Sequence, residues 1–557
     1  MTRPMTVAPR TMPEPNRAET PAPRAADILA RRLHAAGCRH AFGMPGGEVL
    51  TLVDALERAG IAFHLARHEN AAGFIAEGVH HRDGAPAILL ATLGPGAMNA
   101  VNVVANALQD RVPMIVLTGC VDAADALCYT HQVLDHRAVF APITKGSFRL
   151  GADSAALIAE RALALATRPR PGPVHVDVPI SVAAAPCPDR AAPHQPAPAP
   201  TAPHGAALAR ARDWLATAER PLALLGLDLL DAGTVPRAFL EHFSIPAITT
   251  YKAKGILPED HPLALGAAGL SPLADRQLLP LVAQADLVLA IGYDPIEMRA
   301  GWRDPWDPAR QRVIDIAPVA NDHFMHQAGL HLVADPAATL EALAQDLPRR
   351  PRPGWPGDAP ARTRAALRDA FADDGKGWGP AAVIAETRAA LPPGTLATAD
   401  SGAHRILLSQ MWRCDEPRGL VQSSGLCTMG CALPLAIGLK LAAPDRPVVG
   451  FSGDAGFLMS LGELATAAEL GSTAIFVVFV DASLTLIEMK QRQRGMANRG
   501  VDFARHDLAG VARALGGHGY RVRDRAGLRD ALTRAQTADR FTVIAAEIDR
   551  GAYDDRF

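Results

Sequence analysis

The sequence predicts an α/β protein built from three doubly wound parallel-sheet domains, and three observations support this class. The chain has 557 residues, which is enough for three or four domains at roughly 150 residues each. Short aliphatic runs alternate with Ala-rich helical stretches, as strands alternate with crossover helices in parallel sheets. Two stretches dense in Pro then separate three blocks of this pattern.

The expected domain boundaries follow those Pro-rich stretches. The N-terminal residues are polar and rich in Pro, so we expect a disordered tail there. In order, we expect a tail, a first domain, a linker, a central domain, a second linker and a third domain, over residues 1–23, 24–186, 187–206, 207–346, 347–360 and 361–557.

Each block contains runs expected to form buried strands, because each run is short, apolar and followed by a polar residue or a Gly turn. In the first block these runs are 87–94, 114–119 and 174–179. In the central block they are 221–227, 245–250, 285–292 and 312–316. In the third block they are 395–400, 447–453, 474–480 and 541–548.

The composition excludes several classes of function. Lys plus Arg is 56 and Asp plus Glu is 58, so the chain lacks the basic excess typical of nucleic-acid-binding proteins. Aromatic residues are only 5%, which argues against stacking platforms for single strands. No apolar run reaches the ~20 residues of a membrane span, and the N-terminus has no secretory core. We therefore expect neither nucleic-acid nor membrane partners.

The seven cysteines form no CxxC pair, and their odd count does not suit a disulfide framework. Reduced thiols in the cytoplasm are the simplest interpretation. Cys427 and Cys431 lie four residues apart, so we expect two small buried residues on one helix face rather than metal ligands.

The most informative stretch is PVVGFSGDAGFLMSLGELATAAELGSTAIFVVFVD, residues 447–481. It predicts a strand ending at Asp454, a helix over 460–470 and a second strand ending at Asp481. A right-handed crossover makes the two strands parallel, so both aspartates lie at the carboxyl edge of the sheet, where ligands bind. Two carboxylates there suit Mg²⁺ and substrate phosphates, and the small Gly453, Ala455 and Gly456 let the backbone approach a phosphate.

A plainer interpretation of this stretch stays open. Asp454 would then cap the following helix, and Asp481 would simply begin a loop.

Glu69 is the second notable residue, in HLARHENAAGFIAEG, residues 64–78. It follows an expected strand and opens an Ala-rich helix. Small and apolar neighbours suggest that it is buried and available for proton chemistry. The alternative is a first-turn Glu that serves only the helix dipole.

Together these motifs resemble the thiamine-diphosphate-dependent enzymes of the acetolactate synthase/pyruvate decarboxylase superfamily, over nearly all of residues 24–557. The chain is most similar to the catabolic, FAD-independent acetolactate synthases. The resemblance is carried by RHENAAGFIAEG, ATLGPGAMNAVNVVANALQDRVPMIVLTG, THQVLDHRAVFAPITK, GYDPIE, SSGLCTMGCALPLAIGLKLA and GDAGFLMSLGELATA. It implies a pyrimidine-binding, a central and a diphosphate-binding domain, with active sites between the subunits of a homodimer or homotetramer.

The resemblance also implies residue roles. Glu69 would hydrogen-bond the aminopyrimidine ring and so activate the cofactor. Met429 would support the bent cofactor, and the carbonyl of Cys427 would accept from the ring amine. The remaining cofactor contacts would come from Gly402, Ala403, His404, Gly453, Asp454, Ala455 and Gly456, and Mg²⁺ would be held by Asp454, Asp481 and the backbone oxygen of Ser483.

For the reaction, the resemblance implies loss of CO₂ from a 2-oxo acid and attack of the remaining fragment on a second carbonyl. His131, Gln132 and Lys145 match positions around the substrate channel. Leu486 and Ile487 match apolar residues that line the pocket.

Four positions depart from the family pattern. Ala455 stands where the motif usually has Gly, and Asp481 where a metal-binding Asn is usual, which keeps an oxygen ligand. Lys490 replaces the Trp of the biosynthetic acetolactate synthases, and their FAD-contacting sequence is absent around 292–302, so we expect no FAD. Cys427 replaces a Gln of the catabolic enzymes, which leaves the product open.

The prediction is therefore a transferase or lyase that decarboxylates a 2-oxo acid, pyruvate first, and joins the product to a second carbonyl. The alternatives are a simple decarboxylase and a carboligase with another acceptor. A non-catalytic paralogue is the contrasting class, and the retention of Glu69, Asp454 and Asp481 argues against it.

Overall fold

The structure is a computed structural model that describes residues 22–189, 198–321, 323–349 and 354–557. Nearly all of the predicted tail, residues 1–23, lies outside the described residues. Parts of both predicted linkers do so as well.

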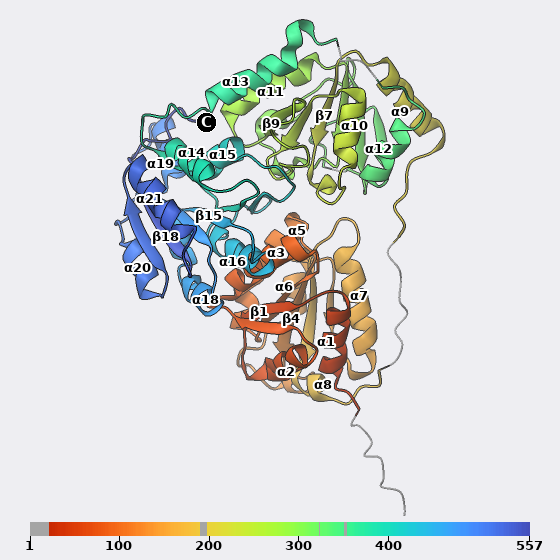
Figure 1. The fold of residues 1–557 in the computed structure, drawn as a ribbon. Helices are drawn as coiled ribbons and strands as arrows, with labels where there is room; N and C mark the ends of the chain where they lie inside the picture. Colours follow the sequence, from red (N-terminus) through yellow and green to blue (C-terminus); the bar gives the residue numbers. More distant parts are fainter. Residues whose placement is uncertain (1–21, 190–197, 322, 350–353) are drawn as a thin grey trace, which may run out of the picture.

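The described residues form three six-stranded sheets, in which every pair of neighbouring strands is parallel. Figure 1 shows them as three separate lobes with helices packed around each sheet. Neighbouring residues of one strand face different cores, since Leu89 belongs to one buried cluster and Leu90 to another. Both faces of the sheet are therefore covered, and the predicted fold class is confirmed.

The first sheet has the strand order β2–β1–β3–β4–β6–β5. Its strands are β1 (His40–Met44), β2 (Ala62–Leu65), β3 (Ala87–Ala91), β4 (Met114–Cys120), β5 (Ser147–Arg149) and β6 (Val174–Pro179). Its helices are α1 (Ala25–Ala35), α2 (Leu50–Arg58), α3 (Glu69–Asp83), α4 (Pro95–Asn99), α5 (Val101–Gln109), α6 (His136–Phe140), α7 (Ala155–Thr167) and α8 (Ile180–Ala184).

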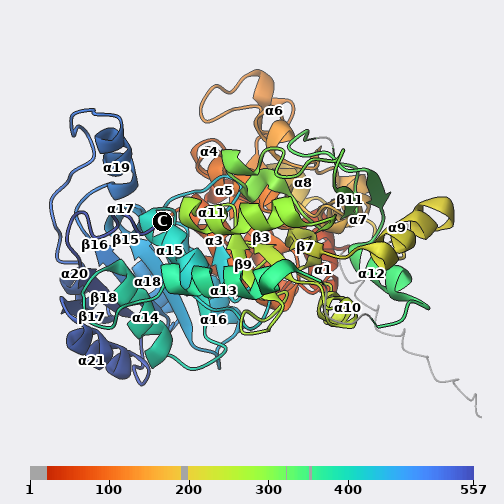
Figure 2. The same cartoon turned by 90° about the horizontal axis from the view of Figure 1, so that it is seen from above.

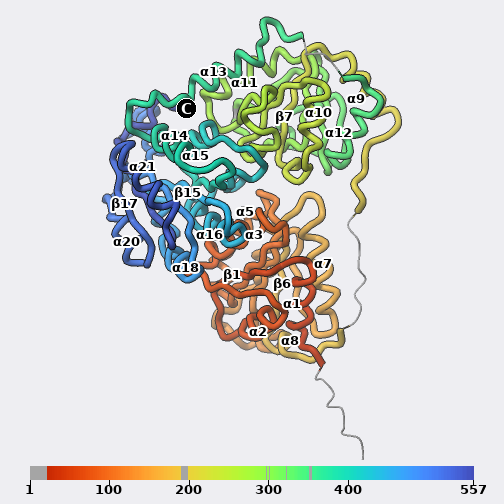
Figure 3. The backbone as a smooth tube through the Cα atoms, viewed as in Figure 1, coloured from red at the N-terminus to blue at the C-terminus, as the bar shows by residue number. Residues whose placement is uncertain are grey.

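The central sheet has a different order, β12–β11–β10–β7–β8–β9. Its strands are β7 (Pro221–Leu225), β8 (Ala247–Thr250), β9 (Ala264–Ala268), β10 (Leu287–Ile291), β11 (Arg312–Ala317) and β12 (Leu330–Val333). Its helices are α9 (Gly205–Thr217), α10 (Val235–Phe243), α11 (Pro272–Gln284) and α12 (Pro336–Ala344). Helix α13 (Ala359–Ala370) also packs here, against α11 and β9 (Figure 3).

The third sheet has the order β14–β13–β15–β16–β18–β17. Its strands are β13 (Leu396–Ala399), β14 (Leu420–Gln422), β15 (Val448–Gly453), β16 (Ile475–Val480), β17 (His518–Val522) and β18 (Thr542–Glu547). Its helices are α14 (Pro380–Ala390), α15 (Ala403–Met411), α16 (Ala432–Ala442), α17 (Asp454–Met459), α18 (Glu463–Glu469), α19 (Thr485–Gln493), α20 (Leu508–Ala514) and α21 (Arg525–Ala535).

All eleven predicted runs overlap strands of these sheets. The predicted helix over 460–470 is α18, and the separate short helix α17 begins directly at Asp454. The prediction for Cys427 is wrong: it is exposed in the loop before α16, because that helix begins only at Ala432. Cys431 is buried, as expected.

Helices α3 and α16 join the first and third domains in one continuous apolar core. They cross at two glycines that leave no room for a side chain. A Cβ added to Gly438 would lie 2.0 Å from the carbonyl oxygen of Ile75, and one added to Gly78 would lie 2.4 Å from that of Leu435. This close crossing sets the relative position of the two domains.

A search of the described residues found no helix that is both long and apolar enough to cross a membrane.

Candidate active site

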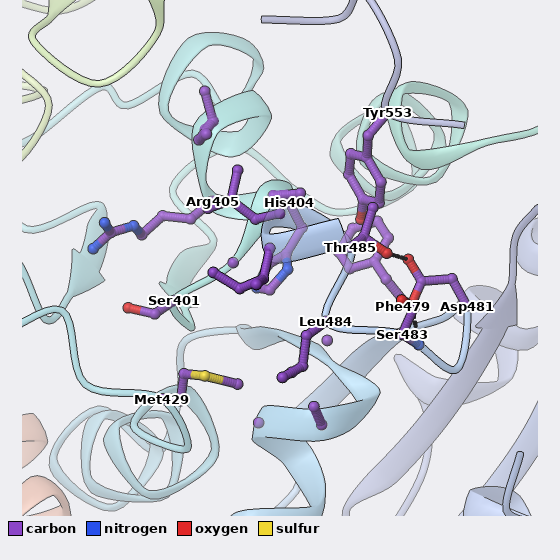
Figure 4. Close-up of a pocket in the computed structure, with 18 of the residues that line it drawn as sticks. Ser401, His404, Arg405, Met429, Phe479, Asp481, Ser483, Leu484, Thr485 and Tyr553 are labelled. Carbon is purple, nitrogen blue, oxygen red and sulfur yellow. Dashed lines mark hydrogen bonds between the residues drawn. The ribbon is translucent and has the colours of Figure 1, made fainter. Parts of the chain in front are cut away.

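The third domain contains a pocket at the carboxyl edge of its sheet (Figure 4). Its volume of about 260 Å³ is far larger than the space one water needs, so it accepts an organic ligand. All of the predicted cofactor and metal residues line it: Gly402, Ala403, His404, Cys427, Met429, Gly453, Asp454, Ala455, Gly456, Asp481, Ser483, Leu486 and Ile487. The structure thus brings together residues separated by up to 85 positions of the chain, from Gly402 to Ile487.

The two aspartates directly follow neighbouring parallel strands, β15 and β16. Each has only about a twentieth of its surface exposed. The Asp454 carboxylate accepts hydrogen bonds from the backbone N–H of Ala455 at 2.9 Å and of Ala482 at 2.8 Å. The Asp481 carboxylate accepts from the Ser483 N–H at 3.2 Å and from the Thr485 hydroxyl.

Burial dominates the electrostatics of this pair. It raises the pKa of Asp454 to about 6, with a further contribution from the charge of Asp481. Burial also raises the pKa of Asp481. A divalent cation between two such carboxylates would relieve both effects. Among the described residues no group of three acidic, His or Cys side chains could hold a metal, so further ligands would come from backbone or cofactor oxygens.

Asp400 holds the loop that carries Met429. It lies after β13, is 1% exposed, and burial raises its pKa. Its carboxylate accepts from the N–H groups of Gly430 at 3.0 Å and Cys431 at 3.3 Å, and from the Ser452 hydroxyl at 2.8 Å. This buried acceptor therefore defines the loop conformation beside the pocket.

His404 lies at the start of α15, in the wall of the pocket. Burial lowers its pKa to about 3, so the imidazole is neutral. Its Nε2 is buried and has no hydrogen-bond partner among the described residues. Because the ring lines the pocket beside Gly402 and Gly453, this nitrogen is suited to a polar ligand atom.

Glu69 lies in the first domain and does not line this pocket. It opens α3, as predicted, and is 3% exposed. The Asn99 side-chain amide donates to its carboxylate at 3.0 Å. A Cβ added to Gly96 would lie 3.0 Å from Glu69 Oε1, so the turn after β3 closes over this carboxylate.

The other predicted catalytic residues also lie in the first domain, outside the pocket. Gln132 lies beside that same turn, because a Cβ added to Gly94 would be 2.8 Å from the Gln132 carbonyl oxygen. His131 is exposed in the long loop after β4. Lys145 donates to the Arg168 carbonyl at 2.7 Å, and its pKa is lowered to about 8 by burial and the charge of Arg168.

The sequence analysis missed eight residues of the pocket wall: Arg299, Ser401, Arg405, Ile406, Phe479, Leu484, Thr485 and Tyr553. Most are neighbours of predicted residues and could have been found from that proximity. Tyr553 could not, because it belongs to the C-terminal segment after β18 and has no motif around it. In Figure 4 its ring reaches down toward Thr485. Burial and the two aspartates raise its pKa well above the usual value.

Comparison with known protein families matches each of the three domains. The model for the N-terminal TPP binding domain of thiamine pyrophosphate enzymes matches residues 23–139. The central-domain model matches residues 208–343, and the model for the C-terminal TPP binding domain matches residues 400–546. Fold, pocket and families together define a thiamine-diphosphate-dependent enzyme, and the chain belongs to the thiamine pyrophosphate enzyme family.

Within that family the chain is acetolactate synthase-like. It is 31% identical to the acetolactate synthase of Bacillus subtilis, over 94% of this chain and 93% of that one. It is 29% identical to the catabolic acetolactate synthase of Raoultella terrigena, over 94% and 95%. A probable 2-ketoarginine decarboxylase of Pseudomonas aeruginosa is 33% identical, over 88% of each chain.

Proposed function

We propose that the protein decarboxylates a 2-oxo acid, pyruvate first, and joins the remaining fragment to a second carbonyl compound, using thiamine diphosphate and Mg²⁺. The observation that carries the proposal is the shared pocket of two buried aspartates, the Met429 loop and His404. A simple decarboxylase is the second candidate, favoured by the similarity to the relative named as a decarboxylase.

The donor set fits a metal-bound diphosphate. Asp454, Asp481 and the backbone oxygen of Ser483 would hold Mg²⁺, since carboxylate and carbonyl oxygens suit this hard cation. The small residues Gly453, Ala455 and Gly456 would let phosphate oxygens approach the backbone. When bound, the cofactor supplies the electron sink that lets a 2-oxo acid lose CO₂.

Glu69 would hold a proton at the pyrimidine ring of that cofactor. Because it does not line the third-domain pocket of its own chain, a complete site needs the first domain of a second copy. The first-domain loop after β4 supports this arrangement. It exposes Leu127, Tyr129 and Leu134 (88%, 60% and 51%), and in Figure 2 the segment leading into α6 projects from the body of the molecule. We therefore propose at least a homodimer.

The central domain supports the proposal of a flavin-free enzyme. Asp228 and Asp294 follow β7 and β10, at the edge where sheets of this order bind nucleotides. The Arg111 guanidinium of the first domain reaches both carboxylates, at 2.5 Å for Asp228. The edge is thus filled by a domain contact.

The seven free cysteines support a further proposal, that the protein works in the reducing cytoplasm.

The test is incubation of the purified protein with thiamine diphosphate, Mg²⁺ and pyruvate, with product identification by mass spectrometry. Acetolactate would establish the carboligase, and acetaldehyde alone would favour the decarboxylase. Pyruvate left unconsumed while the cofactor binds would redirect the search to other 2-oxo acids. A protein that does not bind thiamine diphosphate would contradict the proposal.

A further inference from the structure

Arg405 is a buried cation in the pocket wall to which the proposed function gives no role. It follows His404 in the first turn of α15, and 6% of its surface is exposed. It lines the same pocket as Asp454 and Asp481. Figure 4 shows its side chain extending to the side of the pocket away from Asp481. The pocket therefore has an acidic end and a basic end.

The guanidinium is held firmly by neutral groups. One Nη donates to the Ser423 carbonyl at 2.6 Å, and the other donates to the Cys427 sulfur at 3.2 Å. The guanidinium carbon lies 5.7 Å from the ring centroid of Tyr251, which belongs to the central domain. The buried Nε has no hydrogen-bond partner within the described part of the chain.

The charge of Arg405 has no carboxylate partner among the residues that the structure describes, where a carbonyl, a thiol and an aromatic ring surround it. A buried cation without a counter-ion is costly, and a bound anion removes that cost. A guanidinium is also shaped to bind a carboxylate through two parallel hydrogen bonds. The missing counter-ion therefore points to an anionic ligand.

We propose that Arg405 binds a substrate carboxylate that survives the decarboxylation. This inference rests on the proposed function. The carboxylate that leaves as CO₂ loses its charge in the transition state, so a guanidinium on it would favour the bound substrate and slow the reaction. The partner of Arg405 is thus a carboxylate that stays. It belongs either to the acceptor or to the far end of a dicarboxylic donor.

Matched substrate pairs test this with Arg405→Gln. One arm uses pyruvate as donor and compares 2-oxobutyrate with uncharged propanal as acceptor. The other arm compares CO₂ release from 2-oxoglutarate and from pyruvate. We expect kcat/KM for the carboxylate-bearing member of one pair to fall 10- to 100-fold more than for its partner, as for loss of a charged hydrogen bond. The arm that responds identifies the source of the carboxylate.

Two further variants guard against a purely structural effect. Arg405→Lys keeps the charge without the planar fork, so we expect a smaller loss in the same arm. Arg413→Gln is the control, because Arg413 is exposed just beyond α15. An equal loss for all substrates in Arg405→Gln, or equal use of both members of each pair by the wild type, would overturn the proposal.

A binding measurement separates this inference from the proposed function. Acetate and its uncharged analogue acetamide are titrated by NMR into protein loaded with thiamine diphosphate and Mg²⁺. We expect acetate to bind more tightly, and Arg405→Gln to remove the difference. If no 2-oxo acid releases CO₂, the proposed function fails while this titration still tests Arg405. Equal binding of acetate and acetamide to the wild type would reject a carboxylate site at Arg405.

Discussion

The first and third domains have the same strand order, yet the residues that follow equivalent strands differ. Counting strands from the start of each domain, both orders are 2–1–3–4–6–5. After the third and fourth strands, the third domain has Asp454 and Asp481, whereas the first domain has Thr92 and Val121. Directly after these two strands, the edge therefore carries carboxylates in the third domain only. The comparison teaches that two side chains, not the fold, give one of two equivalent sheet edges a pair of buried carboxylates.

The comparison extends to the second strand of each domain. Glu69 follows β2 and opens α3, while the Met429 loop follows β14 and leads into α16. The two segments thus occupy the same topological position, and their helices pack against each other. One domain has a buried carboxylate there, and the other has the pocket-lining loop that carries Met429.

The largest expected effect comes from making the third domain resemble the first. Asp481→Ala removes a proposed metal ligand, so we expect the affinity for thiamine diphosphate in Mg²⁺ to fall by about 100-fold or more. A fluorescence or calorimetric titration measures it. Asp445→Ala is the control, because Asp445 is exposed at the opposite end of β15. Unchanged affinity in Asp481→Ala would exclude Asp481 as a ligand.

The next largest effect tests Glu69. Glu69→Gln keeps the size of the side chain but cannot hold the proton, so kcat should fall on the order of 100-fold while cofactor binding persists. Steady-state turnover and a cofactor titration together separate the two. Glu341→Gln, at an exposed position of α12, should leave both unchanged. Normal turnover in Glu69→Gln would refute the assignment.

A smaller effect tests the crossing of α3 and α16. Gly438→Ala places a methyl group against the Ile75 carbonyl, and overpacking of this kind costs about 2 kcal/mol, or several degrees in melting temperature. Gly47→Ala is the control, since no atom lies within 4 Å of its new Cβ. Equal melting temperatures by calorimetry for both variants would show that the helices can move apart.

The last effect appears only as a dependence on pH, and it concerns an ionisable side chain that only the first domain buries in this helix pair. Glu77 of α3 is fully buried, and burial together with the charge of Asp110 raises its pKa to about 8. The native state then holds a proton that the unfolded state releases above its ordinary pKa of ~4.3, so stability is lost as pH rises from there to about 8. Relative to Glu77→Gln, wild-type stability should decline by about 1 kcal/mol per pH unit in that window.

Thermal melts of both proteins between pH 5 and 9 (a range chosen to span the pKa of about 8) check this pH dependence. If the melting temperatures of the two proteins change with pH in the same way, Glu77 is not protonated in the folded state.

Much of this comparison could be predicted from the sequence. The two aspartates and Glu69 follow strands that the local pattern predicts, and parallel strands bring such positions to one edge. The place of Met429 came only from the resemblance to the family, because β14 before its loop was not predicted. Six strands were not predicted, namely β1, β5, β9, β12, β14 and β17. Five of them, β5, β9, β12, β14 and β17, are edge strands of their sheets. Three of these, β5, β12 and β14, are only three or four residues long. Their weak apolar signal follows from that position.

Other features depend on tertiary structure and have no local signal. Cys427 adopts a left-handed backbone conformation with φ of 54°, which places it outside the helix that its spacing to Cys431 suggested. Tyr553 reaches the pocket only because the C-terminal segment folds back over the sheet edge. Arg405 has a neutral environment that is created by two separate segments, the loop from Ser423 to Cys427 and Tyr251 of the central domain, so its missing counter-ion is visible only in three dimensions.

The helix crossing also acts as a lever. Glu69 opens α3 nine residues before Gly78, which places it roughly 14 Å along the helix from the fulcrum. A tilt of about five degrees at the glycines would carry that end through roughly 1 Å, a displacement large enough to spoil a reacting geometry. The absence of side chains at Gly78 and Gly438 therefore helps to fix the position of the Glu69 carboxylate, although neither glycine lies near it.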